Sequence, residues 1–406
     1  MRLIRENYLK MIRPYYEADL IKVITGVRRA GKSVILESIR DELSDSRIAA
    51  DHIIYINLED IDYEWIRTAV DLNNEVKTYI TDSGRYYLFI DEIQHVDQFE
   101  KALASFRAVL NASIFVTGSN SRLLSGELAT LLTGRTVEFE ILPFSFSEMK
   151  EYLELNGLPF QDDLIYDYLK WGGFPLRFDF RTETDIHRYL SNLYTGILNR
   201  DILTKKSRID RKIFTDIAMY VLSNAGKEFS ADSIMDYYEK KNHRSVSQRT
   251  VYNYIEKMQK AFLIHSAHKY DISGKTALES KPKYYAVDTG IRTIHTNTIN
   301  YEDTFFLENL VYNELLFQGF TVFSGKTHKG EVDFIAIRNG KKCFIQVSYL
   351  LASQSTVDRE FGAFAPITDA SPKYVLSLDR IDLSRNGIAH LNIVDFLLHR
   401  QSLALT

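Results

Sequence analysis

The chain has 406 residues, of which 45% are hydrophobic and 26% charged, and this ordinary composition excludes a disordered or a fibrous protein. Its 50 basic and 54 acidic residues give a formal net charge of −4, which argues against polyanion binding over the whole surface and leaves room for a local basic patch. The length predicts roughly two to four domains.

A single cysteine, Cys343, excludes an internal disulfide and a zinc site built from cysteines. The N-terminal sequence MRLIRENYLKMI mixes charged with apolar residues and lacks the apolar core of a secretory leader, and no apolar run is long enough to span a bilayer. We therefore expect a cytoplasmic protein that has no membrane partner.

The stretch IKVITGVRRAGKS, residues 21–33, has the pattern of a phosphate-binding P-loop. An apolar run predicts a buried strand, and it leads into Gly-x-x-x-x-Gly-Lys-Ser and then into a helical pattern. Backbone N–H groups of such a loop attract phosphate, the lysine reaches the terminal phosphates, and the hydroxyl of Ser33 can ligate Mg²⁺. A chance match in a strand-to-helix turn is the alternative, and the correctly placed strand and helix argue against it. The predicted ATP-binding residues are Gly26, Val27, Arg28, Arg29, Ala30, Gly31, Lys32, Ser33 and Val34.

The sequence YYLFIDE, residues 86–92, predicts an interior parallel strand that ends in two carboxylates. Ligands bind at this carboxyl edge in open α/β sheets. In this Walker B pattern Asp91 would hold Mg²⁺ and Glu92 would orient and polarise the attacking water, while Lys32 would stabilise the transferred phosphoryl group. Two surface acids at a strand end are the alternative.

Polar residues also end the next predicted strand, at 113–120, so Asn120 or Ser119 is a candidate to contact the γ-phosphate or the attacking water. Arg135 or Arg122, supplied by a neighbouring subunit, would neutralise charge on the transferred phosphoryl group, which makes a homo-oligomer one expectation. A structural salt bridge is the alternative for each arginine.

The segments GVRRAGKS, LFIDEIQ, VTGSNSRLLSGELATLLTGRT and LPFSFSEM resemble a prokaryotic family of AAA-type ATPases that pair this core with a C-terminal domain of unknown function. The resemblance continues through WGGFP at residues 171–175 and covers nearly the whole chain. It implies ATP binding and hydrolysis, and it leaves the biological task of the protein open.

We expect an α/β fold in four parts. These are a P-loop NTPase core with a parallel, AAA-like sheet at residues 1–143, a helical lid at 144–206, a winged-helix domain at 207–290, and a C-terminal nuclease-like α/β domain at 291–406.

The winged-helix prediction rests on three helical patterns followed by a β-hairpin. The third helix would present Gln248, Arg249 and Tyr252 to the major groove of double-stranded DNA. Plain packing between domains is the alternative, because a charge run is usually a solvated face.

The C-terminal part resembles the PD-(D/E)xK nuclease fold, in which a helix and two strands build a Mg²⁺ site. Glu308 falls on a predicted helix, and an Asn-Gly hairpin at residues 339–340 places Asp333 opposite Gln346. Ser348 stands where the catalytic lysine belongs, and no nearby residue plainly replaces it. A degenerate site, kept for DNA or protein binding, is therefore favoured over an active nuclease.

Together these patterns predict an ATPase that uses Mg²⁺ to convert ATP to ADP and phosphate. The cycle would move the other domains and control binding of DNA or a partner. Two alternatives remain. One is a non-enzymatic, nucleotide-dependent switch that binds a protein partner, and the other is a metal-dependent DNA nuclease licensed by ATP.

Overall fold

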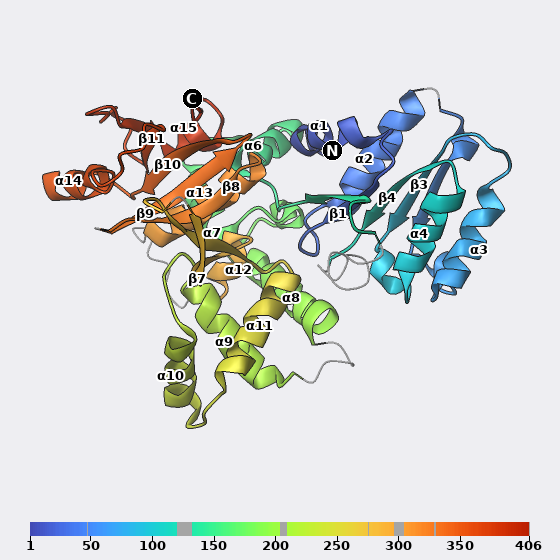
Figure 1. Ribbon diagram of the computed structural model, residues 1–406, viewed down its shortest axis with the longest axis horizontal. Helices are drawn as coiled ribbons and strands as arrows, with labels where there is room; N and C mark the ends of the chain where they lie inside the picture. The colour runs from blue at the N-terminus through green and yellow to red at the C-terminus, as the bar shows by residue number, and fades with distance from the viewer. Residues whose placement is uncertain are drawn as a thin grey trace. The chain divides into compact units, whose positions relative to one another are not determined.

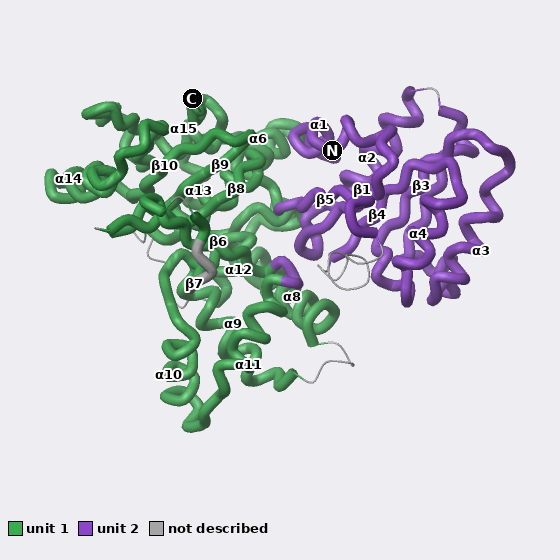
Figure 2. The backbone as a smooth tube through the Cα atoms, in the orientation of Figure 1, with its two compact units in different colours: residues 1, 143–259, 263–406 green, residues 2–142, 260–262 purple. Residues whose placement is uncertain are grey.

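The computed structural model describes residues 1–46, 48–119, 132–203, 209–274, 276–295, 304–328 and 330–405. The chain divides into two compact units, which Figure 2 shows in purple and green. The N-terminal unit consists of residues 2–142 with 260–262, and the C-terminal unit consists of residue 1 with 143–259 and 263–406.

The N-terminal unit is built on a five-stranded parallel sheet with the strand order β2-β3-β4-β1-β5 (Figure 1). Every residue of β1 and β3 is buried, as expected for parallel strands that are covered on both faces. The parallel sheet predicted from the sequence is confirmed. Its strands are β1 (Ile21–Thr25), β2 (Ile53–Asn57), β3 (Tyr86–Asp91), β4 (Ala112–Thr117) and β5 (Thr136–Glu140).

Helices cover both faces of this sheet. Leu72 of α3 and Leu103 of α4 lie in one apolar cluster with Val23 and Ile90 of the strands. Side chains alternate between the two faces of a strand, so Phe89, which lies between residues of this cluster, points to the other face. On that face α2 contacts β1, β3 and β4. The helices of this unit are α1 (Glu6–Ile12), α2 (Lys32–Asp45), α3 (Ala69–Tyr79) and α4 (Phe99–Val109), with short 3-10 turns at Arg13–Tyr15, Ala50–His52, Ile61–Tyr63 and Ile93–His95.

The C-terminal unit contains a seven-stranded mixed sheet with the strand order β12-β11-β10-β9-β8-β6-β7. The antiparallel hairpin β6–β7 joins this sheet because β6 pairs in parallel with β8. The hairpin assigned to the winged helix is therefore continuous with the sheet of the C-terminal part, and the finer division of residues 144–406 stays a prediction. The strands are β6 (Ile264–Asp271), β7 (Thr276–Ala286), β8 (Thr321–Lys326), β9 (Glu331–Arg338), β10 (Lys341–Val347), β11 (Lys373–Ser377) and β12 (Ala389–Asn392).

The turn between β9 and β10 agrees with the sequence. Asn339 has φ 54° and Gly340 has φ 75°, which is the pair of positive φ angles that a tight two-residue hairpin of this type requires. Arg338 lies opposite Lys341, so the predicted register of this hairpin is confirmed.

Helices cover both faces of the second sheet as well. Leu310 of α13 lies in a large apolar cluster with Phe334 and Ile345, while Phe361 of α14 packs with Ile335 in a separate cluster. The helices of this unit are α6 (Phe146–Leu155), α7 (Leu164–Trp171), α8 (Glu183–Ile197), α9 (Arg211–Ser223), α10 (Ala231–Asn242), α11 (Gln248–Lys260), α12 (Thr289–Thr293), α13 (Thr304–Phe317), α14 (Gln354–Gly362) and α15 (Ile393–Leu397), with a 3-10 turn at Pro175–Asp179 and a π-helical turn at Leu198–Ile202. None of the helices in the described ranges combines the length and the apolar character needed to cross a membrane.

Asp288 is a buried carboxylate that ties two segments of the C-terminal unit together. It caps α12 by accepting the N–H of Gly290 at 2.8 Å, and it accepts the N–H of Gly173, which follows α7, at 2.6 Å. A Cβ atom at Gly172, whose φ is +69°, would come within 1.9 Å of this carboxylate. Burial raises the pKa of Asp288 to about 6, and the N–H hydrogen bonds only partly offset this effect.

We expect Asp288→Asn to remove the stabilisation that protonation of Asp288 contributes on acidification. The folded state raises the pKa of Asp288 above the value of about 4 in an unfolded chain, so the stabilisation that protonation gives is fully present below pH 4 and is lost as the pH rises through 6. Between pH 7 and pH 5 this group adds about 1 kcal/mol to the free energy of unfolding. Urea unfolding at both pH values checks this, and an unchanged pH dependence in the variant would contradict it.

Candidate functional site

The predicted P-loop lies between the carboxyl end of β1 and the start of α2. Gly26 has φ +132°, and a Cβ atom there would meet the carbonyl oxygen of Ile141 at 2.2 Å, so this position requires glycine. Gly31 has φ +101° and precedes the first residue of α2. As the N-cap residue it has no side chain to accept the N–H groups of the first turn, which leaves them available to an anion.

Lys32 is a buried cation at this loop. It is 4% exposed, and its Nζ donates to the carbonyl oxygens of Gly26 and Val27, each at 3.2 Å. A buried ammonium group is costly without such partners. The lysine side chain therefore folds back onto the P-loop itself.

Asp91 is the last residue of β3 and Glu92 follows it at the same edge of the sheet, and both are buried. The hydroxyl of Thr117, at the end of β4, donates to Oδ1 of Asp91 and accepts the main-chain N–H of Glu92 at 2.8 Å. The hydroxyl of Tyr55, on β2, donates to Oδ2 of Asp91 at 3.3 Å. Both oxygens of Asp91 are thus held by hydroxyl groups from the neighbouring strands.

Glu92 is held by its backbone and by its side chain. It has φ 56° and ψ 48°, a left-handed conformation that is strained for a non-glycine residue and is frequent at functional sites. Ser119 donates to its Oε1 at 3.1 Å, and the amide of Gln94 donates to its Oε2. Burial raises the pKa of Glu92, but the charges of Lys32 and Arg28 and these hydrogen bonds outweigh burial, so the pKa lies below its ordinary value. The carboxylate is therefore ionised at neutral pH and can accept a hydrogen bond from water.

The oxygen donors of this edge fit Mg²⁺. Ser33 carries a hydroxyl in the first turn of α2, and Asp91 is a carboxylate whose orientation is fixed by two hydroxyls. Within the described ranges, no group of three or more His, Cys, Asp or Glu side chains is arranged to hold a metal. Mg²⁺ commonly uses one or two carboxylates together with substrate phosphates instead of a closed protein cage, so this donor set suits it.

Arg5 is a functional candidate that the sequence did not indicate. It is 1% exposed, its Nη1 donates to the carbonyl oxygen of Ala30 at 2.9 Å, and its guanidinium lies 4.6 Å from the ring centre of Tyr8. It therefore supports the last turn of the P-loop from the segment before α1. Arg28, in the loop itself, forms an ion pair with Glu59 at 3.3 Å.

Three predicted residues are not seen at this site. Arg135 is exposed and immediately precedes β5, whose first residue lies opposite Ile21 at the amino end of β1. The P-loop follows the carboxyl end of β1, so about 16 Å of strand separates Arg135 from the P-loop of its own chain. Asn120 and Arg122 lie outside the described residues.

The candidates in the C-terminal unit fall into two groups. Gln248, Arg249 and Tyr252 are all exposed on α11. Glu308 and Asp333 are buried, and Oε1 of Gln346 accepts the main-chain N–H of Asp333 at 3.3 Å.

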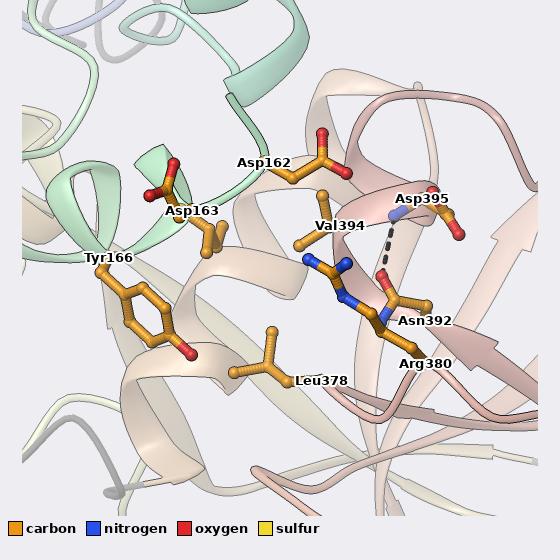
Figure 3. A pocket seen from close by; sticks show the side chains of 9 residues that line it. Asp162, Asp163, Tyr166, Leu378, Arg380, Asn392, Val394 and Asp395 are labelled. Atoms are coloured by element: carbon orange, nitrogen blue, oxygen red, sulfur yellow. Dashed lines mark hydrogen bonds between the residues drawn. The ribbon is translucent and has the colours of Figure 1, made fainter. Parts of the chain in front are cut away.

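A pocket of about 240 Å³ lies elsewhere in the C-terminal unit (Figure 3). Asp162, Tyr166 and Arg380 line it together with residues of the segment that contains Asn392 and Asp395. None of the residues predicted for ATP, DNA or nuclease-like chemistry belongs to its lining, so the predicted chemistry has no connection with this pocket.

Residues 18–150 match a family model described as an AAA domain, and residues 162–301 match one described as a domain of unknown function (DUF8612). An uncharacterized protein of Haemophilus influenzae is 35% identical over 398 residues, which is 97% of this chain and 98% of that protein. The chain belongs to the same family and carries an AAA domain. The AAA-type core predicted from the sequence is thereby confirmed.

A second member of this AAA-domain family is an uncharacterized protein of Methanocaldococcus jannaschii, 32% identical over 363 residues, or 85% of this chain and 78% of that protein. Among solved structures, AMPPCP-bound DnaA from Aquifex aeolicus covers 64% of this chain and 89% of its own, with 15% identity and a TM-score of 0.34.

Proposed function

We propose that this AAA-domain protein binds ATP at residues 26–34 and hydrolyses it to ADP and phosphate with Mg²⁺. The observation that carries the proposal is a pair of buried, oppositely charged side chains at the carboxyl edge of the parallel sheet, beside an uncapped helix start: Lys32, and Glu92, whose pKa the charge of Lys32 lowers. Buried charges are expensive, and their presence at a ligand-binding edge points to chemistry.

Each residue has a role in this proposal. The N–H groups of the loop and of the first turn of α2 bind the phosphates, and Lys32 exchanges the carbonyl oxygens of Gly26 and Val27 for the β- and γ-phosphates. Ser33 and Asp91 would hold Mg²⁺, which neutralises phosphate charge when it is bound. Glu92 orients and polarises the attacking water, and Thr117 fixes the main chain at Glu92.

Two predicted groups complete the proposed site. Asn120 would contact the γ-phosphate, and Arg135 would reach the site of a neighbouring copy in a homo-oligomer. Since Arg135 lies at the opposite end of the sheet from its own P-loop, the proposal requires a second subunit for this contribution.

We further propose that residues 144–206 act as a lid and that 207–290 form a winged helix that couples the cycle to double-stranded DNA. The three candidates Gln248, Arg249 and Tyr252 share the exposed side of α11, while Val251, Tyr254 and Ile255 are buried. This separation is what a recognition helix requires. In the competing proposal the protein is a nucleotide switch that binds a protein partner.

The experiment is a measurement of ATP binding by calorimetry and of phosphate release by the purified full chain. We expect ATP to bind, and we expect phosphate release that stops when EDTA removes Mg²⁺. Stimulation by double-stranded DNA would support the winged-helix proposal. Binding without release would favour the switch, and absence of binding would contradict both.

A further inference from the structure

Two of the three residues expected to hold Mg²⁺ in the C-terminal part, Asp333 and Gln346, make hydrogen bonds within the protein. Oδ2 of Asp333 accepts the N–H of Val347 at 2.8 Å, and Oε1 of Gln346 accepts the N–H of Asp333. The hydroxyl of Ser348 donates to the carbonyl oxygen of Leu350 at 3.4 Å. A hard divalent cation needs several oxygen ligands at about 2.0–2.6 Å, and in the part of the chain that the structure describes no three or more His, Cys, Asp or Glu side chains converge to supply them.

A lysine from another strand lies in this cluster. Nζ of Lys283, on β7, is 3.8 Å from Oε2 of Glu308 on α13 and 3.6 Å from Oε2 of Glu331 on β9. The other oxygen of Glu331 accepts the hydroxyl of Ser324 at 2.6 Å. Lys283 and Glu308 are each 4% exposed, so the ammonium group has little access to water and depends on these carboxylates.

The electrostatics agree with a lysine that remains charged. Burial lowers the pKa of Lys283, but the carboxylates of Glu308, Asp333 and Glu331 outweigh burial and the net shift is upward. Burial raises the pKa of Asp333 to about 6, and the charge of Lys283 offsets part of that rise. The upward shift in the pKa of Lys283 keeps its ammonium group charged at neutral pH beside these carboxylates.

We propose that the ammonium group of Lys283 is the resident cation of this cluster, takes the place that a divalent metal has in the nuclease-like arrangement, and leaves the cluster unable to bind Mg²⁺ or Mn²⁺. A divalent ion bound by the same carboxylates would lie close to the ammonium and be repelled by it. The cluster thus connects β7, β9 and α13 as an internal ion network. It offers neither a metal-bound water nor a positive surface to a DNA phosphate.

The test is a titration of the nucleotide-free full chain with Mn²⁺, in which the electron paramagnetic resonance signal of the unbound ion measures how much Mn²⁺ the protein binds. We expect the wild type and Asp333→Asn to bind the same amount of Mn²⁺. Lys283→Met should gain one additional site per chain, and this site should disappear in Lys283→Met combined with Asp333→Asn. A matched control is Lys342→Met on β10 of the same sheet, which breaks the ion pair of Lys342 with Asp369 and should gain no site.

Thermal unfolding gives a second readout. Lys283→Met should melt at least about 5 °C below wild type in EDTA because it leaves buried carboxylates without a cation, and Mn²⁺ should raise the melting temperature of the variant alone. Wild-type Mn²⁺ binding that Asp333→Asn removes would overturn the inference, as would a folded Lys283→Met that gains no site. If Lys283→Met does not fold, Lys283→Gln and the comparison of wild type with Asp333→Asn decide the question.

Discussion

Glu92→Gln is expected to lower the rate of ATP hydrolysis at least about 100-fold while the protein still binds ATP. Glutamine keeps the size of the side chain and can still accept the hydroxyl of Ser119, but it loses the negative charge that polarises water. The pKa of Glu92 lies below its ordinary value, so the wild-type carboxylate is charged at neutral pH and the substitution removes a full charge. Phosphate release and calorimetric ATP binding, measured on the same preparation, check both parts.

The matched control for this variant is Glu64→Gln. Glu64 belongs to the same unit, its side chain is 66% exposed, and its ion pair with Arg67 is of the surface type that contributes little. This control should hydrolyse ATP like wild type. If Glu92→Gln retained most of the wild-type rate, the assignment of Glu92 as the water-activating residue would be wrong.

Lys32→Met is expected to weaken ATP binding by roughly 10- to 100-fold, because methionine removes a charge-assisted hydrogen bond to phosphate. The ammonium group also lowers the pKa of Glu92, so its loss should raise that pKa. In the pH profile of any remaining hydrolysis, the acidic limb should therefore move to higher pH, and the alkaline limb should move less. Calorimetric titration with ATP measures the affinity, and the pH dependence of phosphate release measures the second effect.

An exposed lysine of the same unit, Lys77 on α3, supplies the control. Lys77→Met should leave the affinity for ATP at the wild-type value. Equal ATP affinity in Lys32→Met and wild type would contradict the proposed phosphate contact.

The sequence predicted the AAA core well because its signals are local. Parallel strands buried on both faces are continuous apolar runs, so β1 and β3 were recognisable together with the glycines and acids that follow them. The Asn-Gly turn at residues 339–340 likewise fixed the register of its hairpin, since the required φ angles belong to the turn itself.

The sequence did not predict hydrogen bonds and ion pairs between residues that come together only in the tertiary structure. Arg5 precedes α1 yet reaches the P-loop carbonyl of Ala30, and an arginine beside an amphipathic helix is usually exposed. Thr117 ends a strand like many other threonines, and only the strand order places it between Asp91 and Glu92. Lys283 belongs to a hairpin that was assigned to the winged helix, so its approach to Glu308 depends on the pairing of β6 with β8.

The most direct measurement is a single turnover, in which the full chain, in excess over γ-labelled ATP and with Mg²⁺ present, is sampled over time for labelled phosphate. We expect the wild type to convert all bound ATP to ADP and phosphate, and we expect Glu92→Gln to return the bound ATP intact. Recovery of intact ATP from the wild type after binding would contradict the hydrolase, and the protein would then be a nucleotide-dependent switch.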